Sequence, residues 1–454
     1  MTSAIDYAHS NFDRFQSELV DLLKIPSVST DPAYKDDMYR AANWLADHMR
    51  GIKLENVEVM ETGGHPLVYA DWLHAGDDAP TVLIYGHYDV QPAVMEDGWS
   101  HNPFDPQIRD GKIFARGATD DKGQVMLQLK AAESLLATDS CPVNLKYLIE
   151  GEEESGSENL ERFIREHQDL LAADVCVISD TGITALEEPS LVYGLRGSLA
   201  MELVVSGPRQ DLHSGLGGIL HNPVQALTEI VSKLHDETGK VTVPGFYDNV
   251  ADVSDEERAM LNKLVYSEDQ WTYIMGDLPE YGEAGYTIIE RMGIRPTLEI
   301  NGIAGGYAGT GFKTVIGASA IAKISCRLVP NQDPARIKSL IQSYIDDITP
   351  DTVRSEINFL DGTYPVVTDM NHPAVQAVIR AYSKRWQGKD VLLTRIGGSI
   401  PVVANFQTIL DIPVVLPGFA LPDANMHGPD ENFYLEMYHR GIDTIITLMQ
   451  ELAG

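Results

Sequence analysis

The periodicity of apolar residues changes twice along this chain of 454 residues. Up to residue 198, short apolar runs alternate with amphipathic segments, and the same alternation returns from residue 372 to the end. Residues 199–371 differ, because runs such as AMELVVSG (200–207) place an apolar side chain at every second position. A strand with that period has one buried face and one face in water. The sequence therefore predicts one domain, in segments 1–198 and 372–454, that is interrupted by a second domain at 199–371.

The outer segments predict an α/β domain in which a mixed sheet is covered by helices on both faces. Strands are expected at 80–86, 143–149, 174–179 and 412–418. Helices are expected at 12–24, 37–50, 122–137, near 157–168, at 373–386, after Gly398 and near 431–452.

The middle segment predicts a smaller α+β domain. Its strands are expected at 200–207, 297–301, 314–329 and 353–360, with helices at 223–235 and 334–346. Residues 245–290 give weak signals and are expected to form loops and short helices.

The charge balance restricts the partners of this protein. The chain carries 67 acidic and 34 basic residues, a formal net charge of -33, which argues against binding to nucleic acid or to an anionic membrane. No apolar run approaches the roughly 18 residues of a membrane span, and the N-terminus lacks the features of a secretory signal. Cys141, Cys176 and Cys326 lie far apart and are expected to be free thiols. We expect a cytoplasmic protein.

Histidine and acidic residues follow several of the predicted strands. His87 comes directly after strand 80–86, with Asp89 two residues on, and Asp180 follows strand 174–179. Ligand sites of open α/β sheets form at the carboxyl ends of strands. Alone, each residue has an ordinary structural explanation, such as a hydrogen-bonded histidine inside the fold.

Two further acidic groups precede predicted helices. Asp120 and Asp121 lie between two glycines just before helix 122–137, where capping is the usual role of an acid, although one carboxylate can also serve two cations. Five glutamates crowd into residues 150–158 after a buried strand. A solvated helix start is the simple explanation, but such repulsion is costly unless cations neutralise part of it.

A second histidine, His427, lies in the loop ANMHGPDENF before the last helix. Two histidines with three carboxylates at strand ends form an oxygen-rich site that suits Zn²⁺, Mn²⁺ or Co²⁺ better than Ca²⁺. Other hydrolytic templates are absent from the sequence, since it contains no HExxH, no GxSxG and no GxxxxGK[ST].

Taken in order, the motifs resemble those of one metallopeptidase family. GHYDVQP, RGATDDKGQ, EGEEESGS, SDTG, DLHSG, RLVPNQDP, GGSIP and MHGPDENF follow one another from residue 86 to residue 433. This order resembles the family that contains carnosinase, cytosolic non-specific dipeptidase, aminoacylase, glutamate carboxypeptidase and succinyl-diaminopimelate desuccinylase. The carnosinase and non-specific dipeptidase branch is the most similar.

The resemblance implies two divalent metal ions, most simply Zn, with Mn or Co as alternatives. It assigns His87 and Asp180 to one metal, Glu154 and His427 to the other, and Asp120 to both. Asp89 would orient His87, and Glu153 would be the general base. The additional Glu152 makes the glutamate assignment ambiguous until the spacing to SGS is counted.

The resemblance also assigns substrate contacts to the inserted domain, which would act as a lid and dimerisation domain. His213 would reach the active site of a partner subunit and stabilise the oxyanion. Arg327 would bind the substrate's terminal carboxylate, because its planar guanidinium can bind a carboxylate through two hydrogen bonds. Thr314 and Ser399 would be further contacts. An ion pair on a strand surface remains an alternative for Arg327, as does an ordinary loop histidine for His213.

The expected activity is hydrolysis of the amide bond of dipeptides or short peptides with a free C-terminal carboxylate. A water molecule between the metals would attack the carbonyl carbon, and Glu153 would take its proton. The resemblance also implies a homodimer. An N-acyl-amino-acid deacylase is the alternative, since its substrates too carry a carboxylate beside the amide. A metal-containing protein without catalysis is a third reading, but it would not need Glu153.

Overall fold

The structure is a computed structural model that describes residues 2–264, 272, 275–276 and 278–454. It divides into two compact units. Unit 1 comprises Met1–Tyr193, Thr368–Thr394 and Pro401–Gly454, and unit 2 comprises Gly194–Val367 and Arg395–Ile400.

Unit 1 is built on a six-stranded mixed sheet with the order β1-β2-β6-β3-β7-β17. The neighbours β6, β3, β7 and β17 are parallel, whereas β1 and β2 add an antiparallel edge. The strands are β1 (Glu55–Met60), β2 (Leu67–Trp72), β3 (Thr81–His87), β6 (Asn144–Glu150), β7 (Val175–Ile178) and β17 (Val414–Val415). The pattern of the sequence did not predict β1 and β2. Strand β1 contains two glutamates and no buried residue, so its apolar signal is weak.

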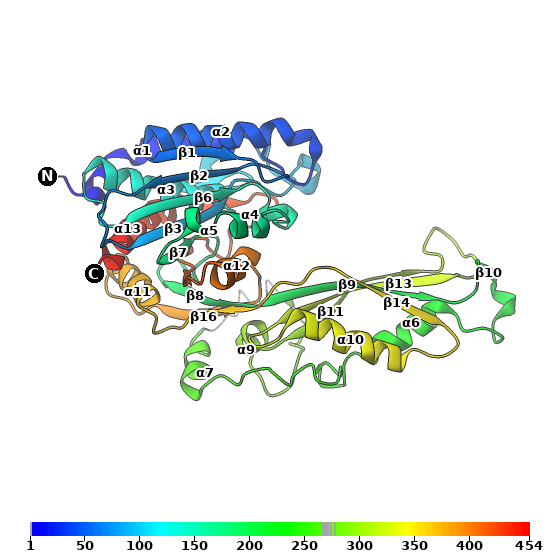
Figure 1. The fold of residues 1–454 in the computed structure, drawn as a ribbon. Helices are drawn as coiled ribbons and strands as arrows, with labels where there is room; N and C mark the ends of the chain where they lie inside the picture. The colour runs from blue at the N-terminus through cyan, green and yellow to red at the C-terminus, as the bar shows by residue number, and fades with distance from the viewer. Residues whose placement is uncertain (1, 265–271, 273–274, 277) are drawn as a thin grey trace. The chain divides into compact units, whose positions relative to one another are not determined.

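Helices cover both faces of this sheet, as predicted (Figure 1). Ile84 and Val177 on one face share a core with α1 (Ala4–Leu23), α2 (Lys35–Gly51), α3 (Lys122–Ala137), α11 (Pro373–Arg385) and α13 (Leu435–Leu452). Tyr85 points to the other face and meets Phe406 of α12 (Pro401–Ile409) edge to face. The helix α12 contacts α4 (Leu160–Glu166), which precedes the short α5 (Gln168–Leu171).

The helix boundaries agree closely with the periodicity of the sequence. Helix α3 spans the predicted residues, and α1 begins earlier than predicted, because a capping box between Ser3 and Asp6 starts it.

Several short strands lie outside the six-stranded sheet. They are β4 (Gln107–Arg109), β5 (Lys112–Phe114), β8 (Ser190–Leu195), β15 (Val366–Val367), β16 (Leu392–Ile396) and β18 (Asn432–Tyr434). The chain passes between the two units four times: within β8, after Val367 of β15, within β16 and after Ile400.

Unit 2 contains a four-stranded antiparallel sheet with the order β11-β13-β9-β14. The strands are β9 (Gly197–Ser206), β11 (Thr297–Gly305), β13 (Ser319–Leu328) and β14 (Arg354–Phe359). Leu199 and Leu203 face a core with α6 (Pro223–Val231) and α10 (Pro334–Ile348), while Ser198 and Glu202 lie on the other face. Both helices lie on the same side of the sheet (Figure 1). The period of two predicted from the sequence is therefore real.

Three details of unit 2 differ from the sequence pattern or extend it. The expected strand 314–329 is two strands, β12 (Val315–Ile316) and β13, with Gly317 and Ala318 between them. Strand β12 pairs with β10 (Leu212–His213). Residues 245–290 contain α7 (Asp255–Leu261) and the start of α9 (Ile288–Gly293), and part of this stretch lies outside the described residues.

Residues 395–400, expected in the third segment of the outer domain, belong to unit 2. Side chains of unit 2 hold this segment. Arg395 forms an ion pair with Glu257, and Arg196 Nε donates to the carbonyl oxygen of Gly397 at 3.3 Å. The periodicity of a sequence cannot show such contacts between distant residues.

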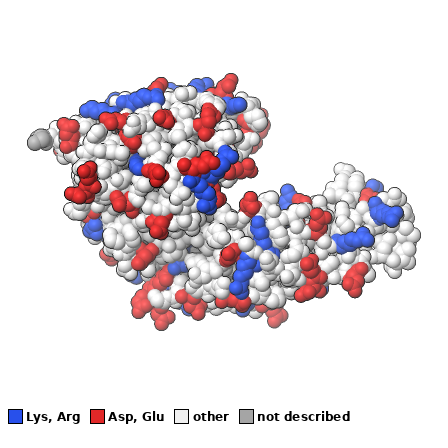
Figure 2. All heavy atoms as spheres, in the orientation of Figure 1, with Lys and Arg blue, Asp and Glu red and all other residues white. Residues whose placement is uncertain are grey.

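Acidic side chains are spread over the visible surface of both units, with basic ones between them (Figure 2). Such a mixed, predominantly acidic surface agrees with the net charge of -33. Among the helices of the described residues, none combines the length and apolar character needed to cross a membrane.

Gly123 offers a test of the packing at the start of α3. A Cβ atom at this position would lie 1.9 Å from the carbonyl oxygen of Ala118 and 2.8 Å from Phe433 Cδ1. Although alanine favours helices over glycine, overpacking of this kind costs roughly 1–3 kcal/mol. We expect Gly123→Ala to lower the free energy of unfolding by about that amount.

Urea unfolding measures this change. Gly51→Ala is the matched control, because its Cβ would have no heavy atom within 4 Å at the end of α2. The control should leave the midpoint unchanged or raise it slightly. A Gly123→Ala protein with the wild-type midpoint would contradict the packing argument.

Candidate metal centre

Three predicted ligands lie at the ends of neighbouring parallel strands. His87 is the last residue of β3, Asp180 follows β7, and Glu154 lies in a 3-10 turn (Glu153–Ser155) that follows β6. Strand β3 pairs with both β6 and β7, so the three side chains emerge at one edge of the sheet. This is the edge at which open α/β sheets bind ligands.

Asp120 and His427 reach the same place from two loops. Asp120 precedes α3, and its Oδ1 lies 3.1 Å from His87 Nε2, which is 3.9 Å from Asp180 Oδ2. Its Oδ2 lies 2.9 Å from His427 Nε2, which is 3.3 Å from Glu154 Oε1. The two oxygens of one carboxylate thus belong to two groups of potential ligands, His87–Asp120–Asp180 and Asp120–Glu154–His427.

The electrostatics of these groups favour positive charge. Burial raises the pKa of Asp180 well above its usual range, and the neighbouring Asp120 and Asp121 raise it further. Burial acts in the same direction on the pKa of Asp121. Asp120 differs, because hydrogen bonds with His427 and His87 outweigh burial and lower its pKa. Crowded carboxylates with two imidazole nitrogens form a donor set that fits divalent cations.

Asp89 fixes the orientation of His87. The Nδ1 of His87 lies 3.0 Å from the carbonyl oxygen of Asp89 and 3.4 Å from its Oδ1. Since a carbonyl oxygen only accepts, Nδ1 carries a proton, and Nε2 is the nitrogen that faces Asp120 and that would bind a cation once deprotonated. The carboxylate of Asp89 also accepts from the backbone N–H groups of Glu153 at 3.2 Å and Glu154 at 2.9 Å. One residue therefore positions both the histidine and the glutamate turn.

The structure separates Glu152 from Glu153. Glu152 points away from the ligand groups, and its Oε1 accepts from His65 N–H and from Asn159 Nδ2, each at 3.1 Å. Glu153 remains beside the ligand groups. Burial and the nearby charges of Glu154 and Asp89, opposed by His87, raise the pKa of Glu153 to about 7.

Three residues that sequence reasoning missed support the ligand groups. Gln91 Nε2 donates to Glu154 Oε2 at 2.7 Å. Arg116 and Glu431 form a buried ion pair of 2.7 Å beneath the loop that carries Asp120. Arg116 lies in the motif RGATDD and Glu431 in MHGPDEN. The spacing of these motifs does not show which backbone groups the two side chains contact.

The comparisons with known proteins identify the family. Residues 83–451 match the model of peptidase family M20/M25/M40. This chain belongs to that family. The family predicted from the sequence is thus confirmed, and the protein is a metallopeptidase.

The relatives of this metallopeptidase align over nearly its whole length. The Cys-Gly metallodipeptidase dug1 of Schizosaccharomyces pombe is 34% identical, with 97% of this chain and 96% of the relative covered. The metallo-carboxypeptidase Sso-CP2 of Sulfolobus solfataricus is 32% identical with a TM-score of 0.86, and covers 97% of this chain and 99% of its own. Human carnosine dipeptidase 1 is 29% identical with a TM-score of 0.84, covering 99% of this chain and 98% of its own.

The four predicted substrate residues of the metallopeptidase form two pairs within unit 2. The side chain of His213 lies beside Thr314, with 3.3 Å between His213 Nε2 and Thr314 Oγ1. Arg327 donates from its guanidinium to Ser399 Oγ at 2.7 Å. Each pair joins residues that are far apart in the sequence, as β10, β12, β13 and the segment 395–400 bring them together.

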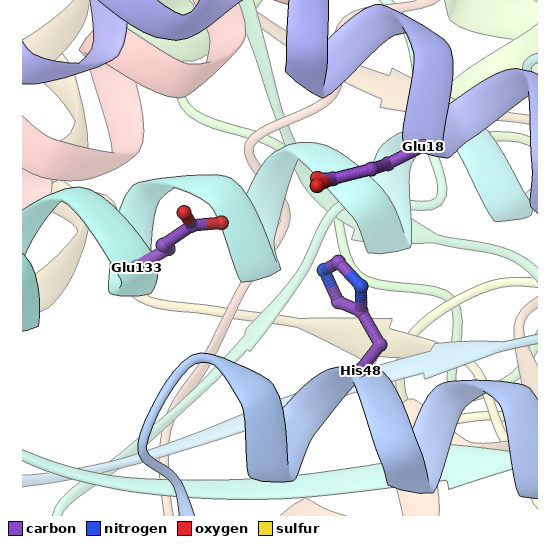
Figure 3. A group of neighbouring side chains, drawn as sticks. All are labelled: Glu18, His48 and Glu133. Atoms are coloured by element: carbon purple, nitrogen blue, oxygen red, sulfur yellow. The ribbon is translucent and has the colours of Figure 1, made fainter.

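A third group of possible ligands, Glu18, His48 and Glu133, lies between α1, α2 and α3 (Figure 3). A cation is already present there, because the buried Lys130 ammonium lies 2.7 Å from His48 Nε2 and 2.9 Å from Glu133 Oε2 and also contacts Glu18. Burial and the charge of Lys130 lower the pKa of His48 to about 4, so its neutral ring accepts from the ammonium. This group is a structural ion network.

Proposed function

We propose that this metallopeptidase hydrolyses the amide bond of dipeptides and short peptides that carry a free C-terminal carboxylate. The observation that carries the proposal is the carboxylate of Asp120, whose two oxygens serve two separate ligand groups. The names of the relatives, which include dipeptidases with Cys-Gly and β-Ala-His specificity, support the substrate class.

Two divalent cations would occupy these groups. His87 and Asp180 would hold one cation, Glu154 and His427 would hold the other, and Asp120 would serve both. Mixed imidazole and carboxylate donors favour Zn²⁺, with Mn²⁺ or Co²⁺ as alternatives. When bound, such cations act as Lewis acids that acidify water and polarise a carbonyl group.

Glu153 is the general base of the proposed reaction. It accepts a proton from the attacking water and returns that proton to the nitrogen of the leaving amine. Burial favours the protonated form of Glu153, so this side chain can hold the proton between the two transfers. Asp89, by accepting from the N–H groups of Glu153 and Glu154, holds this turn in place.

The pairs in unit 2 provide the proposed substrate contacts. Arg327 binds the terminal carboxylate through its planar guanidinium, Ser399 fixes the direction of that guanidinium, and Thr314 is a further contact. His213 Nδ1 accepts from the N–H of Gly215 at 3.0 Å, so the proton of the neutral ring lies on Nε2. This N–H can donate to a developing oxyanion.

We also propose that the protein is a homodimer in which unit 2 contacts a second copy. Large apolar side chains are exposed close in sequence to His213 and Thr314, namely Leu216, Ile219, Tyr307 and Phe312. Exposed apolar side chains that gather in a patch can mark an interface. We infer that His213 acts in the active site of the partner subunit, which would make unit 2 a dimerisation and lid domain.

A cytoplasmic location completes the proposal. Cys141, Cys176 and Cys326 are all free, and two of them are buried. Free thiols are usual in a reducing compartment.

A hydrolysis panel separates the dipeptidase from an N-acyl-amino-acid deacylase. The metal-reconstituted protein should be assayed on several dipeptides, β-alanyl-histidine, tripeptides and N-acetyl amino acids, each also as its C-terminal amide. We expect dipeptides with a free carboxylate to give the highest kcat/KM, at least tenfold above their amides, because a lost charged hydrogen bond costs roughly 1.5–3 kcal/mol. A preference for N-acetyl amino acids would favour the deacylase.

The assignment of Glu153 as general base predicts the effect of Glu153→Gln. This variant keeps the shape of the side chain but cannot accept the proton, so kcat should fall by about 10²–10⁴. The metal content, measured by elemental analysis, should be unchanged. Glu152→Gln is the matched control and should keep most of the turnover, since its carboxylate faces His65 and Asn159. Full turnover in the Glu153→Gln variant would contradict the assignment.

The proposed dimer predicts complementation between two inactive variants. His213→Ala and Glu153→Gln subunits are mixed and allowed to exchange. If His213 acts in the partner's site, each heterodimer has one complete site, and an equal mixture should regain about a quarter of the wild-type activity by random pairing. Absence of recovery, with exchange demonstrated by labelled subunits, would show that His213 does not act across an interface.

A further inference from the structure

Glu431 is a fully buried carboxylate that neither catalysis nor direct ligand binding explains. It lies just before β18, and its four acceptor positions all face the loop that carries Asp120. Its Oε2 accepts from Arg116 at 2.7 Å and from the N–H of Gly117 at 3.0 Å. Its Oε1 accepts from the N–H groups of Thr119 at 2.9 Å and Asp120 at 3.1 Å. The backbone that presents Asp120 is thus fixed by one side chain.

Arg116 extends this contact to His427. A second guanidinium nitrogen of Arg116 donates to the carbonyl oxygen of His427 at 3.1 Å. The backbone of His427 is in the left-handed region, with φ of 61°, and its side chain is 56% exposed. Because so little packs against the imidazole, its position depends on how the backbone is held.

The same two loops are joined again on either side of the ion pair. Thr119 Oγ1 donates to the carbonyl oxygen of Asn432 at 2.7 Å, and the N–H of Ala115 donates to the carbonyl oxygen of Glu431 at 3.1 Å. The backbone of Asp120 and that of His427 are therefore held relative to each other, and the Arg116–Glu431 ion pair lies between them.

We propose that Arg116 and Glu431 are positioning residues that set the cation affinity of the group formed by Asp120, Glu154 and His427. The proposal rests on the ligand roles proposed above. The supporting partners of metal ligands typically contribute 10–100-fold to metal affinity. Removing one member of a buried ion pair also leaves the other charge uncompensated, which is strongly destabilising.

The effect is asymmetric between the two ligand groups. His87 and Asp180 come from the ends of β3 and β7, and Asp89 orients His87. This group depends on the Arg116–Glu431 pair through Asp120 alone. The other group depends on the pair through both Asp120 and His427, so its affinity should fall further.

The experiment titrates the metal-free, full-length protein with Co²⁺ and follows the visible absorption of the bound ion. The step that disappears in His427→Ala identifies the His427 group. In Glu431→Gln, an amide replaces one acceptor oxygen, and the dissociation constant of that step should rise by about 10–100-fold. Arg116→Lys keeps the positive charge but cannot bond both Glu431 and the His427 carbonyl. It should weaken the same step, and it tests the proposal even if Glu431→Gln fails to fold.

Glu133→Gln is the matched control for a general loss of stability. Glu133 is also a largely buried carboxylate in ion pairs, with Lys130 and Arg14, and it belongs to the ion network between α1, α2 and α3. Its thermal midpoint should fall, while both Co²⁺ steps should remain as in the wild type. Wild-type Co²⁺ binding by both test variants, or equal weakening in Glu133→Gln, would overturn the proposal. Because no substrate is present, a failure of the peptidase assignment would leave these outcomes unaffected.

Discussion

The carboxylate of Asp120 is the group on which the rest of this site depends. Its two oxygens face two histidines that are far apart in the sequence. Oδ1 lies 3.1 Å from His87 Nε2, and Oδ2 lies 2.9 Å from His427 Nε2. A buried carboxylate needs compensation, and further acids surround this one. The sheet edge, the loop before α3 and the loop before β18 must therefore all be held with precision. Asp89 and Glu431 contribute to this by accepting hydrogen bonds from backbone N–H groups. Two acids outside the proposed ligand set therefore position the acids that we propose as cation ligands.

The division of the chain into two units separates two kinds of chemistry. The proposed ligands and Glu153 all belong to unit 1, at the edge of a sheet whose core is formed from several helices. The proposed substrate residues belong to unit 2 and form their own hydrogen-bonded pairs there. Contacts within each unit thus help to orient the side chains that we propose to be functional. The chain enters unit 2 twice, and its second, short visit at residues 395–400 brings Ser399 to Arg327.

Much of the fold could be predicted from the sequence, because buried parallel strands and amphipathic helices leave strong periodic signals. Helix α3 and strands β3 and β6 fall within one residue of the predicted positions. The edge strand β1 left little signal, since it contains two glutamates and none of its residues is buried, and its neighbour β2, although almost fully buried, was not predicted either. The two strands within 314–329 could not be separated, because a break at Gly317 and Ala318 depends on contacts with the neighbouring loop.

The same distinction holds for the site. Residues that follow buried strands, such as His87 and Asp180, carry a local signal, because the polar side chain comes directly after an apolar run. Glu431 carries none, because it acts on the backbone of residues more than 300 positions away in the sequence. A carboxylate whose partners are N–H groups looks, in the sequence, like any acid in a polar loop. Only its complete burial beside four donors supports the positioning role that we propose for Glu431, in the same motif MHGPDENF as His427, whose imidazole faces Asp120.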